Sequence, residues 1–81
     1  MRSIDAVRMR LKNLMKEHKT NYNDLSIKSG LPRSTIKTFF YYKNARSVTI
    51  YTLSMLCSGL GITLTDFFND DIFKYVDDIE A

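Results

Sequence analysis

Four polar side chains within one short stretch have the types and the spacing needed to contact base edges. They are Arg33, Ser34, Lys37 and Thr38, and steps of three to four residues place them on one face of a helix. An arginine can donate two hydrogen bonds to O6 and N7 of guanine, and serine or threonine hydroxyls adapt to several base edges. No acidic side chain interrupts this face, so it predicts hydrogen bonding to bases in a DNA groove.

The charge of the chain is unevenly distributed along its length. Residues 1–46 carry eleven lysines and arginines against three acids, or +8, whereas residues 47–81 carry one lysine against six acids, or −5. Such a split predicts that one end of the molecule attracts polyanions and that the other repels them. Charge alone is equally compatible with an ordinary solvated polar face on each helix.

Other kinds of chemistry have little support in the sequence. The only histidine, His18, has no nucleophile and carboxylate placed beside it by a recognisable motif, and the only cysteine, Cys57, falls on an apolar helical stripe. No Cys/His cluster has metal-ligand spacing, and no glycine-rich phosphate loop is present. We therefore expect no catalytic residue, metal or other cofactor, with His18 at a helix end and Cys57 buried.

The sequence also gives an expectation for where the protein acts. Its amino end lacks the basic patch, apolar stretch and small-residue cleavage site of a secretory signal. No apolar run approaches the roughly 20 residues that span a bilayer. We expect a cytoplasmic, nucleoid-associated protein without membrane contact.

Apolar periodicity in the first half predicts three helices. The first begins at Ser3, which we expect to cap it, and ends near His18 and Lys19. The second covers residues 22–29, with Asn21 as its cap and Gly30 as the turn that ends it. Its inward positions would be Leu25 together with either Ile27 or the neighbours of Lys28 toward Ser29. After Leu31 as an apolar plug and Pro32 as an opening residue, the third covers residues 33–40, with Ile36 and either Phe39 or Phe40 facing inward.

The second half predicts a loop and further helices. Residues 41–48 read as a basic loop, after which Thr49 caps a fourth helix and Gly61 ends it. Thr63 caps a short fifth helix through Phe68, and the acidic segment 69–81 predicts a last helix. The apolar stripe of the fourth helix comprises Ile50, Leu53, Leu56, Cys57 and Leu60, and that of the last comprises Ile72, Phe73, Val76 and Ile79.

Two short helices joined by a glycine turn, the second with small polar and basic side chains outside, form the helix-turn-helix arrangement. Residues 21–36 resemble the central signature of the Xre/Cro/phage-repressor family, and residues 53–68 resemble its fourth and fifth helices. The likeness covers roughly residues 7–68. It implies an all-α fold, a compact lambda-repressor-like bundle of five helices, to which a short C-terminal helix would be added. We expect a domain at 1–69 and an acidic segment at 70–81.

The resemblance also implies a role for each site residue. Base edges would be read by Arg33, Ser34, Lys37 and Thr38 with Thr35 nearby, and phosphates would be held by Asn21, Tyr22, Lys43, Asn44 and Arg46. Family members often have glycine where this chain has Tyr42 and proline where it has Val48, with Asn44 as a substitute for the glycine. The aromatic run 39–42 is expected to pack in the core, the alternative being an exposed patch for a partner or for sugars.

These features predict a sequence-specific DNA-binding transcription regulator, a repressor in a bacterium or a mobile element. One recognition helix reads few base pairs, so a homodimer on an inverted-repeat operator is expected, with dimer contacts from the fifth helix and the acidic end. The alternative is a protein-interaction module of antitoxin or adaptor type. RNA binding ranks third and enzyme function last. Control through concentration, proteolysis or a regulatory protein partner is left open.

Overall fold

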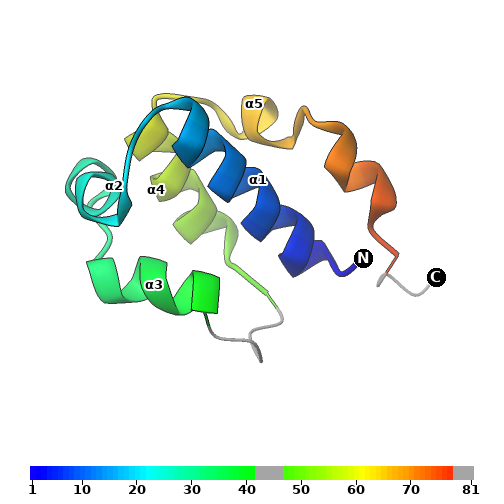
Figure 1. The fold of residues 1–81 in the computed structure, drawn as a ribbon, viewed down its shortest axis with the longest axis horizontal. Helices are drawn as coiled ribbons and strands as arrows, with labels where there is room; N and C mark the ends of the chain where they lie inside the picture. The colour runs from blue at the N-terminus through cyan, green and yellow to red at the C-terminus, as the bar shows by residue number, and fades with distance from the viewer. Residues whose placement is uncertain (42–46, 78–81) are drawn as a thin grey trace.

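Six helical segments make up the part of the chain that the structure describes, a computed structural model covering residues 1–41 and 47–77 (Figure 1). They are α1 (Ser3–Glu17), α2 (Tyr22–Ser29), α3 (Arg33–Tyr41), α4 (Ile50–Leu60), α5 (Leu64–Phe68) and the 3-10 helix η1 (Asp71–Tyr75). The prediction of an all-helical bundle is therefore confirmed. In Figure 1, α3 and α5 lie on opposite sides of the pair α1 and α4.

Most helix boundaries follow local capping rules. The side chains of Asn21, Thr49 and Thr63 each accept a hydrogen bond from a backbone N–H in the first turn of the following helix. These N–H groups have no partner within the helix, so each cap satisfies one of them. Gly30 and Gly61 end α2 and α4 in the left-handed conformation, with φ of 80° and 74°. All five of these predictions are confirmed.

The core lies where α1, α2, α3 and α4 meet, and α5 closes it with Phe67. Its members are apolar residues at helical spacing: Ile4, Val7, Leu11, Leu14, Met15, Leu25, Leu31, Ile36, Phe39, Leu53, Leu56, Cys57, Leu60 and Phe67. Burial of such side chains contributes on the order of 1.5–3 kcal/mol each. Leu31, predicted as an apolar plug, and Cys57, predicted as a small buried residue, are both in this core.

Two apolar residues that the periodicity placed inward are in fact exposed. Ile27 in α2 is 73% exposed and Ile50 at the start of α4 is 65% exposed. The inward face of α2 is made instead by Leu25 and Ser29, four residues apart. In an eight-residue helix, two apolar positions cannot define a face by themselves, and tertiary packing decides which side is covered.

Two predicted helix ends are also wrong. The N-cap of α1 is Arg2, whose side chain makes no capping hydrogen bond, and Ser3 is already the first helical residue. This helix ends at Glu17, with His18 as the C-cap, as its predicted helix-end role requires. At the other end of the motif, α3 continues through Tyr41, a residue that the sequence assigned to the loop.

In place of the predicted helix over residues 69–81, the described part of the chain has a short 3-10 helix of five residues. Asp70 caps η1 by accepting from the N–H of Ile72, and the backbone is extended again at Val76. This segment packs on α1, where Arg10 lies 3.2 Å from Asp70 and the backbone N–H of Asp77 donates to the carbonyl of Met1. Docking on α1 thus takes the place of a continued helix, and the amino-terminal nitrogen of Met1 lies 2.6 Å from the Asp77 carboxylate. The predicted apolar position Ile79 lies outside the described residues.

Candidate nucleic-acid interface

The turn between α2 and α3 is fixed by backbone conformation and by two serine hydroxyls. Gly30 has φ of 80°, which an L side chain adopts only with strain, and its N–H donates to the carbonyl of Ser26. The Ser26 hydroxyl donates to the carbonyl of Leu31 at 2.6 Å, and the Leu31 N–H donates to the Ser29 hydroxyl at 3.2 Å. With Leu31 buried, these bonds set the direction in which α3 leaves the turn.

The angle of α2 depends on a close approach to α4 that the sequence analysis missed. A Cβ added at Gly59, in the last turn of α4, would lie 3.0 Å from both the Cβ and the backbone nitrogen of Ser29. Glycine inside a helix costs about 1 kcal/mol relative to alanine, so its presence needs a reason of this kind. The small pair Gly59 and Ser29 lets the two helices pack backbone against side chain. A glycine inside a predicted helix was the available signal.

The outer face of α3 presents the predicted base-reading residues to solvent. All five of them are exposed, namely Arg33, Ser34, Thr35, Lys37 and Thr38. The inner face of the same helix buries Ile36 and Phe39. Within residues 1–41 and 47–77 the structure records no ion pair for Arg33 or Lys37, so both cations are available to an anionic ligand.

The carboxyl end of α3 is held by an arginine from α1. Arg8 donates through Nε to the carbonyl of Phe39 at 2.7 Å, and its guanidinium lies 5.9 Å from the centroid of the Phe39 ring. This carbonyl is among the last four of the helix, which lack an intrahelical partner. The guanidinium also lies 3.4 Å from Asp5. Arg8 therefore positions the exposed helix, a role that local sequence spacing could not reveal across 31 residues.

A second arginine of α1 has a similar task at α5. Arg10 donates to the carbonyls of Phe67 and Asp66 at 2.8 and 2.9 Å, and to the Asp70 carboxylate at 3.2 Å. The count of +8 for the first half therefore includes arginines that are engaged in holding the fold. The cations of α3, Arg33 and Lys37, face outward instead, as do the exposed lysines Lys12, Lys16, Lys19 and Lys28 of the other helices and turns.

The two predicted phosphate-binding residues of α2 have partners within the protein. The Asn21 side chain accepts from the backbone N–H of Asp24 at 2.9 Å as the helix cap. The Tyr22 hydroxyl lies 3.4 Å from that of Tyr41, at the carboxyl end of α3. Hydrogen bonding to Tyr41, followed by burial, raises the pKa of Tyr22 to about 12, so this phenol stays protonated at neutral pH.

The aromatic run that begins at Phe39 divides between core and surface. Phe39 is buried, Phe40 is half-buried against the ring of Tyr22 with centroids 5.3 Å apart, and Tyr41 is 69% exposed. The prediction of core packing is thus confirmed for the first residue and wrong for Tyr41. Tyr42 and the predicted loop contacts Lys43, Asn44 and Arg46 lie outside the described residues.

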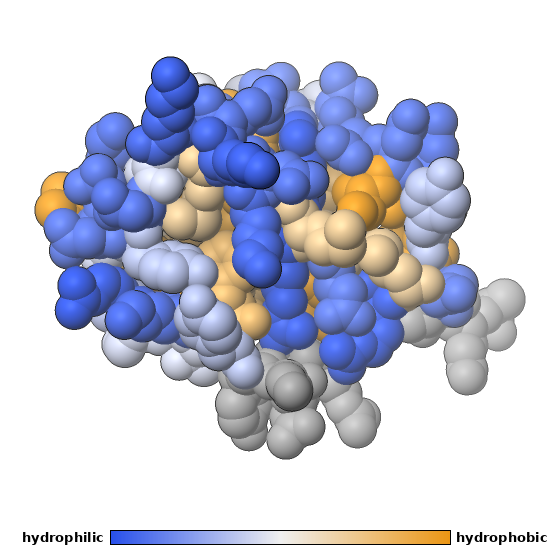
Figure 2. Space-filling view, in the orientation of Figure 1, coloured by the Kyte–Doolittle hydropathy of each residue, from blue (hydrophilic) through white to orange (hydrophobic). Residues whose placement is uncertain are grey.

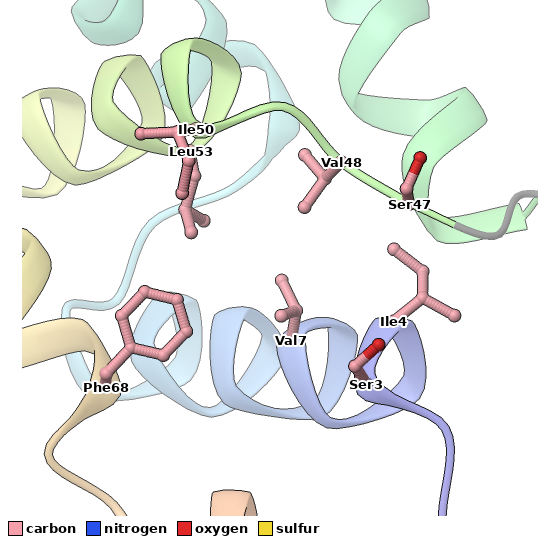
Figure 3. A pocket seen from close by; sticks show the side chains of 8 residues that line it. All are labelled: Ser3, Ile4, Val7, Ser47, Val48, Ile50, Leu53 and Phe68. Atoms are coloured by element: carbon pink, nitrogen blue, oxygen red, sulfur yellow. The ribbon is translucent and has the colours of Figure 1, made fainter. Parts of the chain in front are cut away.

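On the other side of the bundle, a shallow apolar groove of about 230 Å³ runs between α1, α4 and α5 (Figure 3). Ile4 and Val7 of α1 line one side, Val48 and Ile50 the other, and Phe68 of α5 closes one end. Phe68 is 42% exposed. The view of Figure 2 shows a largely polar surface in which apolar side chains emerge in separate patches.

The remaining candidates for chemistry have structural surroundings. Burial, with a smaller contribution from the Asp66 charge, raises the pKa of the Cys57 thiol, which favours its neutral form. Over residues 1–41 and 47–77, no three His, Cys, Asp or Glu side chains come together as a metal site would require. In the same ranges, none of the helices combines the length and the apolar character needed to cross a membrane.

Comparisons with known proteins give a family and a structural relative. The family model for the Cro/C1-type HTH DNA-binding domain matches residues 10–78. The wild-type restriction-modification controller protein C.Esp1396I is similar in structure, with a TM-score of 0.73 and 28% identity over 88% of each chain. A single-substitution variant of that controller gives a TM-score of 0.74 at 28% identity, covering 88% of this chain and 91% of its own. A search of curated protein sequences gives no match.

Proposed function

The chain belongs to the family of Cro/C1-type helix-turn-helix DNA-binding domains, and we propose that it represses transcription as a homodimer bound to an inverted-repeat operator. DNA-binding transcription regulation follows from the family itself. Repression requires only that the bound protein occupy a promoter, and the exposed face of α3 supports such binding. We place its action in the cytoplasm, on the nucleoid.

The observation that carries this proposal is the outer face of α3. Arg33 and Lys37 have no ion pair among the described residues, and Ser34, Thr35 and Thr38 are exposed beside them. In the family, the helix after the glycine turn enters the major groove. We assign base reading to these five residues and phosphate contact to Asn21, Tyr22, Lys43, Asn44 and Arg46. Base contacts choose the sequence, whereas phosphate contacts set register and affinity.

A dimer would supply specificity that one nine-residue helix lacks. Two copies related by a two-fold axis read half-sites about 10–10.5 bp apart. The exposed ring of Phe68, at the end of the groove of Figure 3, supports α5 as part of the contact. The acidic carboxyl end would join it. Both α5 and the described part of the acidic end, residues 70–77, lie away from α3, as a surface that must not meet phosphates should (Figure 1).

The test is selection of a binding site from a random double-stranded DNA library, performed at two salt concentrations. We expect an inverted repeat to be enriched and placement of that repeat over a promoter to reduce expression of a reporter. Arg33→Ala should weaken binding to the enriched site. Lys74→Ala is its matched control and should bind normally, because it removes the same charge from η1, where Lys74 is exposed and paired with Asp71. No enrichment by a folded protein would favour the protein-interaction module instead.

The dimer has its own test. Phe68→Ser should shift the protein toward the monomer in sedimentation equilibrium and weaken binding to the full repeat more than binding to a single half-site. A wild-type protein that is monomeric both free and on the repeat would refute the dimer while leaving DNA binding intact.

A further inference from the structure

Two tyrosine hydroxyls from different helices converge at the carboxyl end of α3. Tyr22 lies in the first turn of α2 and Tyr41 is the last residue of α3, and their hydroxyl oxygens are 3.4 Å apart. The Tyr22 ring is held between two others, with its centroid 5.3 Å from that of Phe40 and 6.4 Å from that of Tyr41. The Tyr22 oxygen is therefore placed by packing, and the more exposed Tyr41 brings its own oxygen beside it through the ring contact.

The distance between the hydroxyls is long for a mutual hydrogen bond. O–H···O bonds between hydroxyls span about 2.5–3.0 Å, so the Tyr22–Tyr41 contact is weak. Each phenol has one proton to donate. If one tyrosine donates its proton to the other, the proton of the second tyrosine has no recorded acceptor. An anionic oxygen lying outside the pair, within reach of both, would accept both protons in stronger, charge-assisted bonds.

Tyr41 also lies in line with the face that we assign to DNA. It follows Ser34 by seven residues, Lys37 by four and Thr38 by three, which are the spacings of neighbours along one helical face. The exposed ammonium of Lys37 is thus one turn away and attracts an anion to this end of the row. The nearest acid along α2 is Asp24, two residues from Tyr22, and residues two apart on a helix do not face each other.

We propose that the Tyr22–Tyr41 hydroxyl pair is a binding site for one DNA backbone phosphate, and that Tyr41 is a DNA-contacting residue. Both hydroxyls donate to the phosphate oxygens, and the pair joins the start of α2 to the end of α3 across the edge of the groove. This inference rests on the proposed function and adds to it a contact from the residue that the sequence assigned to the loop.

The experiment compares Tyr41→Phe and Tyr22→Phe with the matched control Tyr75→Phe. Tyr75 is 69% exposed, as Tyr41 is, but lies in η1. The probes are a duplex carrying the selected repeat and a random-sequence duplex of equal length. We expect each test variant to bind both duplexes about three- to tenfold more weakly and the control to bind normally. The double variant should lose little more than either single one, because both hydroxyls hold the same phosphate.

Salt dependence separates this contact from those of the cations. The slope of log K against log salt reports the number of cations that neutralise phosphates, at about 0.9 per phosphate on duplex DNA. Tyr41→Phe removes no cation, so its affinity should fall with the slope unchanged. In addition, the contacted phosphate can be replaced by an uncharged methylphosphonate. Wild-type protein should bind this duplex more weakly than the unmodified duplex, whereas Tyr41→Phe should bind the two duplexes equally.

Each result decides between the inference and its alternatives. Wild-type affinity of Tyr41→Phe on both duplexes, with or without a lower melting temperature, would assign the pair to the fold alone and overturn the inference. A loss confined to the selected repeat would indicate a base contact and also overturn it. If the wild-type protein binds neither duplex, the proposed function fails as well, whereas binding by wild type and equal binding by the tyrosine variants removes this inference only.

Discussion

The arginines of α1 and the cations of α3 look alike in the sequence and have different surroundings in the fold. Arg8 and Arg10 donate to main-chain carbonyls of α3 and α5 and to acidic side chains. Arg33 and Lys37, on the exposed face of α3, have no ion pair within the described ranges. One group of charges holds the bundle together, and the other is left for a ligand. A count of charged residues along the sequence adds the two groups together and cannot distinguish them.

The largest expected effect comes from removing an arginine of α1. Arg10→Met keeps much of the side-chain volume but leaves the carbonyls of Asp66 and Phe67 without their donor. We expect the free energy of unfolding to fall by about 2–3 kcal/mol, as for lost hydrogen bonds of a charged group. Chemical denaturation measures this, with Lys12→Met as the control, because Lys12 is an exposed residue of the same helix. Equal stabilities of the two variants would show that Arg10 does not hold the fold more than an exposed lysine of the same helix does.

Removing a cation of α3 should weaken DNA binding and leave the stability of the fold unchanged. Arg33→Ala should cost about 1–3 kcal/mol of binding to the selected repeat and relax the choice of base at one position, with no change in the denaturation midpoint. Arg46→Ala should weaken binding to all sequences alike. Binding titrations on matched and mismatched duplexes distinguish the two. Uniform losses from both variants would take Arg33 out of base reading.

Gly30, in the turn before α3, and Gly61, at the end of α4, both have a left-handed backbone. Substituting each with alanine therefore introduces a similar strain in the two regions. Alanine at Gly30 or Gly61 should each destabilise the protein by about 1–2 kcal/mol, since both have positive φ. Gly30→Ala should in addition weaken DNA binding, because this turn aims α3, whereas Gly61→Ala should leave the binding of the folded protein unchanged. Denaturation and titration of both variants test this. Parallel losses of affinity would show that the turn has no special part in recognition.

The smallest expected effect concerns acid. The hydrogen bonds of Asp66 with Thr63 in the capping box of α5, followed by the Arg10 charge, hold the pKa of Asp66 below its ordinary 3.8. A depressed pKa contributes stability that is present above 3.8 and is lost as the pH falls through the folded value. The cap of α2 is the uncharged amide of Asn21.

Below pH 4, therefore, α5 should loosen before α2 and α3. Amide exchange followed by NMR from pH 5 to pH 2.5 measures the order of the two events. Asp66→Asn should remove the early loosening as a pH-dependent step, and Asn21→Ala should not change its pH dependence. Loss of protection in α2 ahead of α5 would contradict the assignment.

Much of the fold could be predicted because its signals are local. A cap residue, a glycine turn and an apolar stripe act within a few positions, which is why Asn21, Thr49, Thr63, Gly30 and Gly61 were correctly placed. The inward face of α3 followed from the spacing of Ile36 and Phe39 in the same way. Exposure of Ile27 and Ile50 could not be predicted, because it depends on which side of a short helix its neighbours cover.

In the candidate site, too, local features could be predicted and long-range contacts could not. The outward residues of α3 could be named from spacing and chemistry, whereas the contacts that position α3 join residues far apart in the chain. Arg8 reaches Phe39 and Gly59 reaches Ser29 across 30 or so positions, and no periodicity records such pairs. The end of α3 at Tyr41 was missed for a related reason, since the Tyr22 ring that packs against it comes from another helix.

The contact between Gly59 and Ser29 offers a way to redesign where the protein binds without touching any residue that meets DNA. Because a Cβ at position 59 would press on the backbone of α2, a graded series from alanine to valine should tilt α2 by small steps and carry α3 with it through the turn. In the proposed dimer, the spacing of the two half-sites would then be adjustable from this one half-buried position near the end of α4.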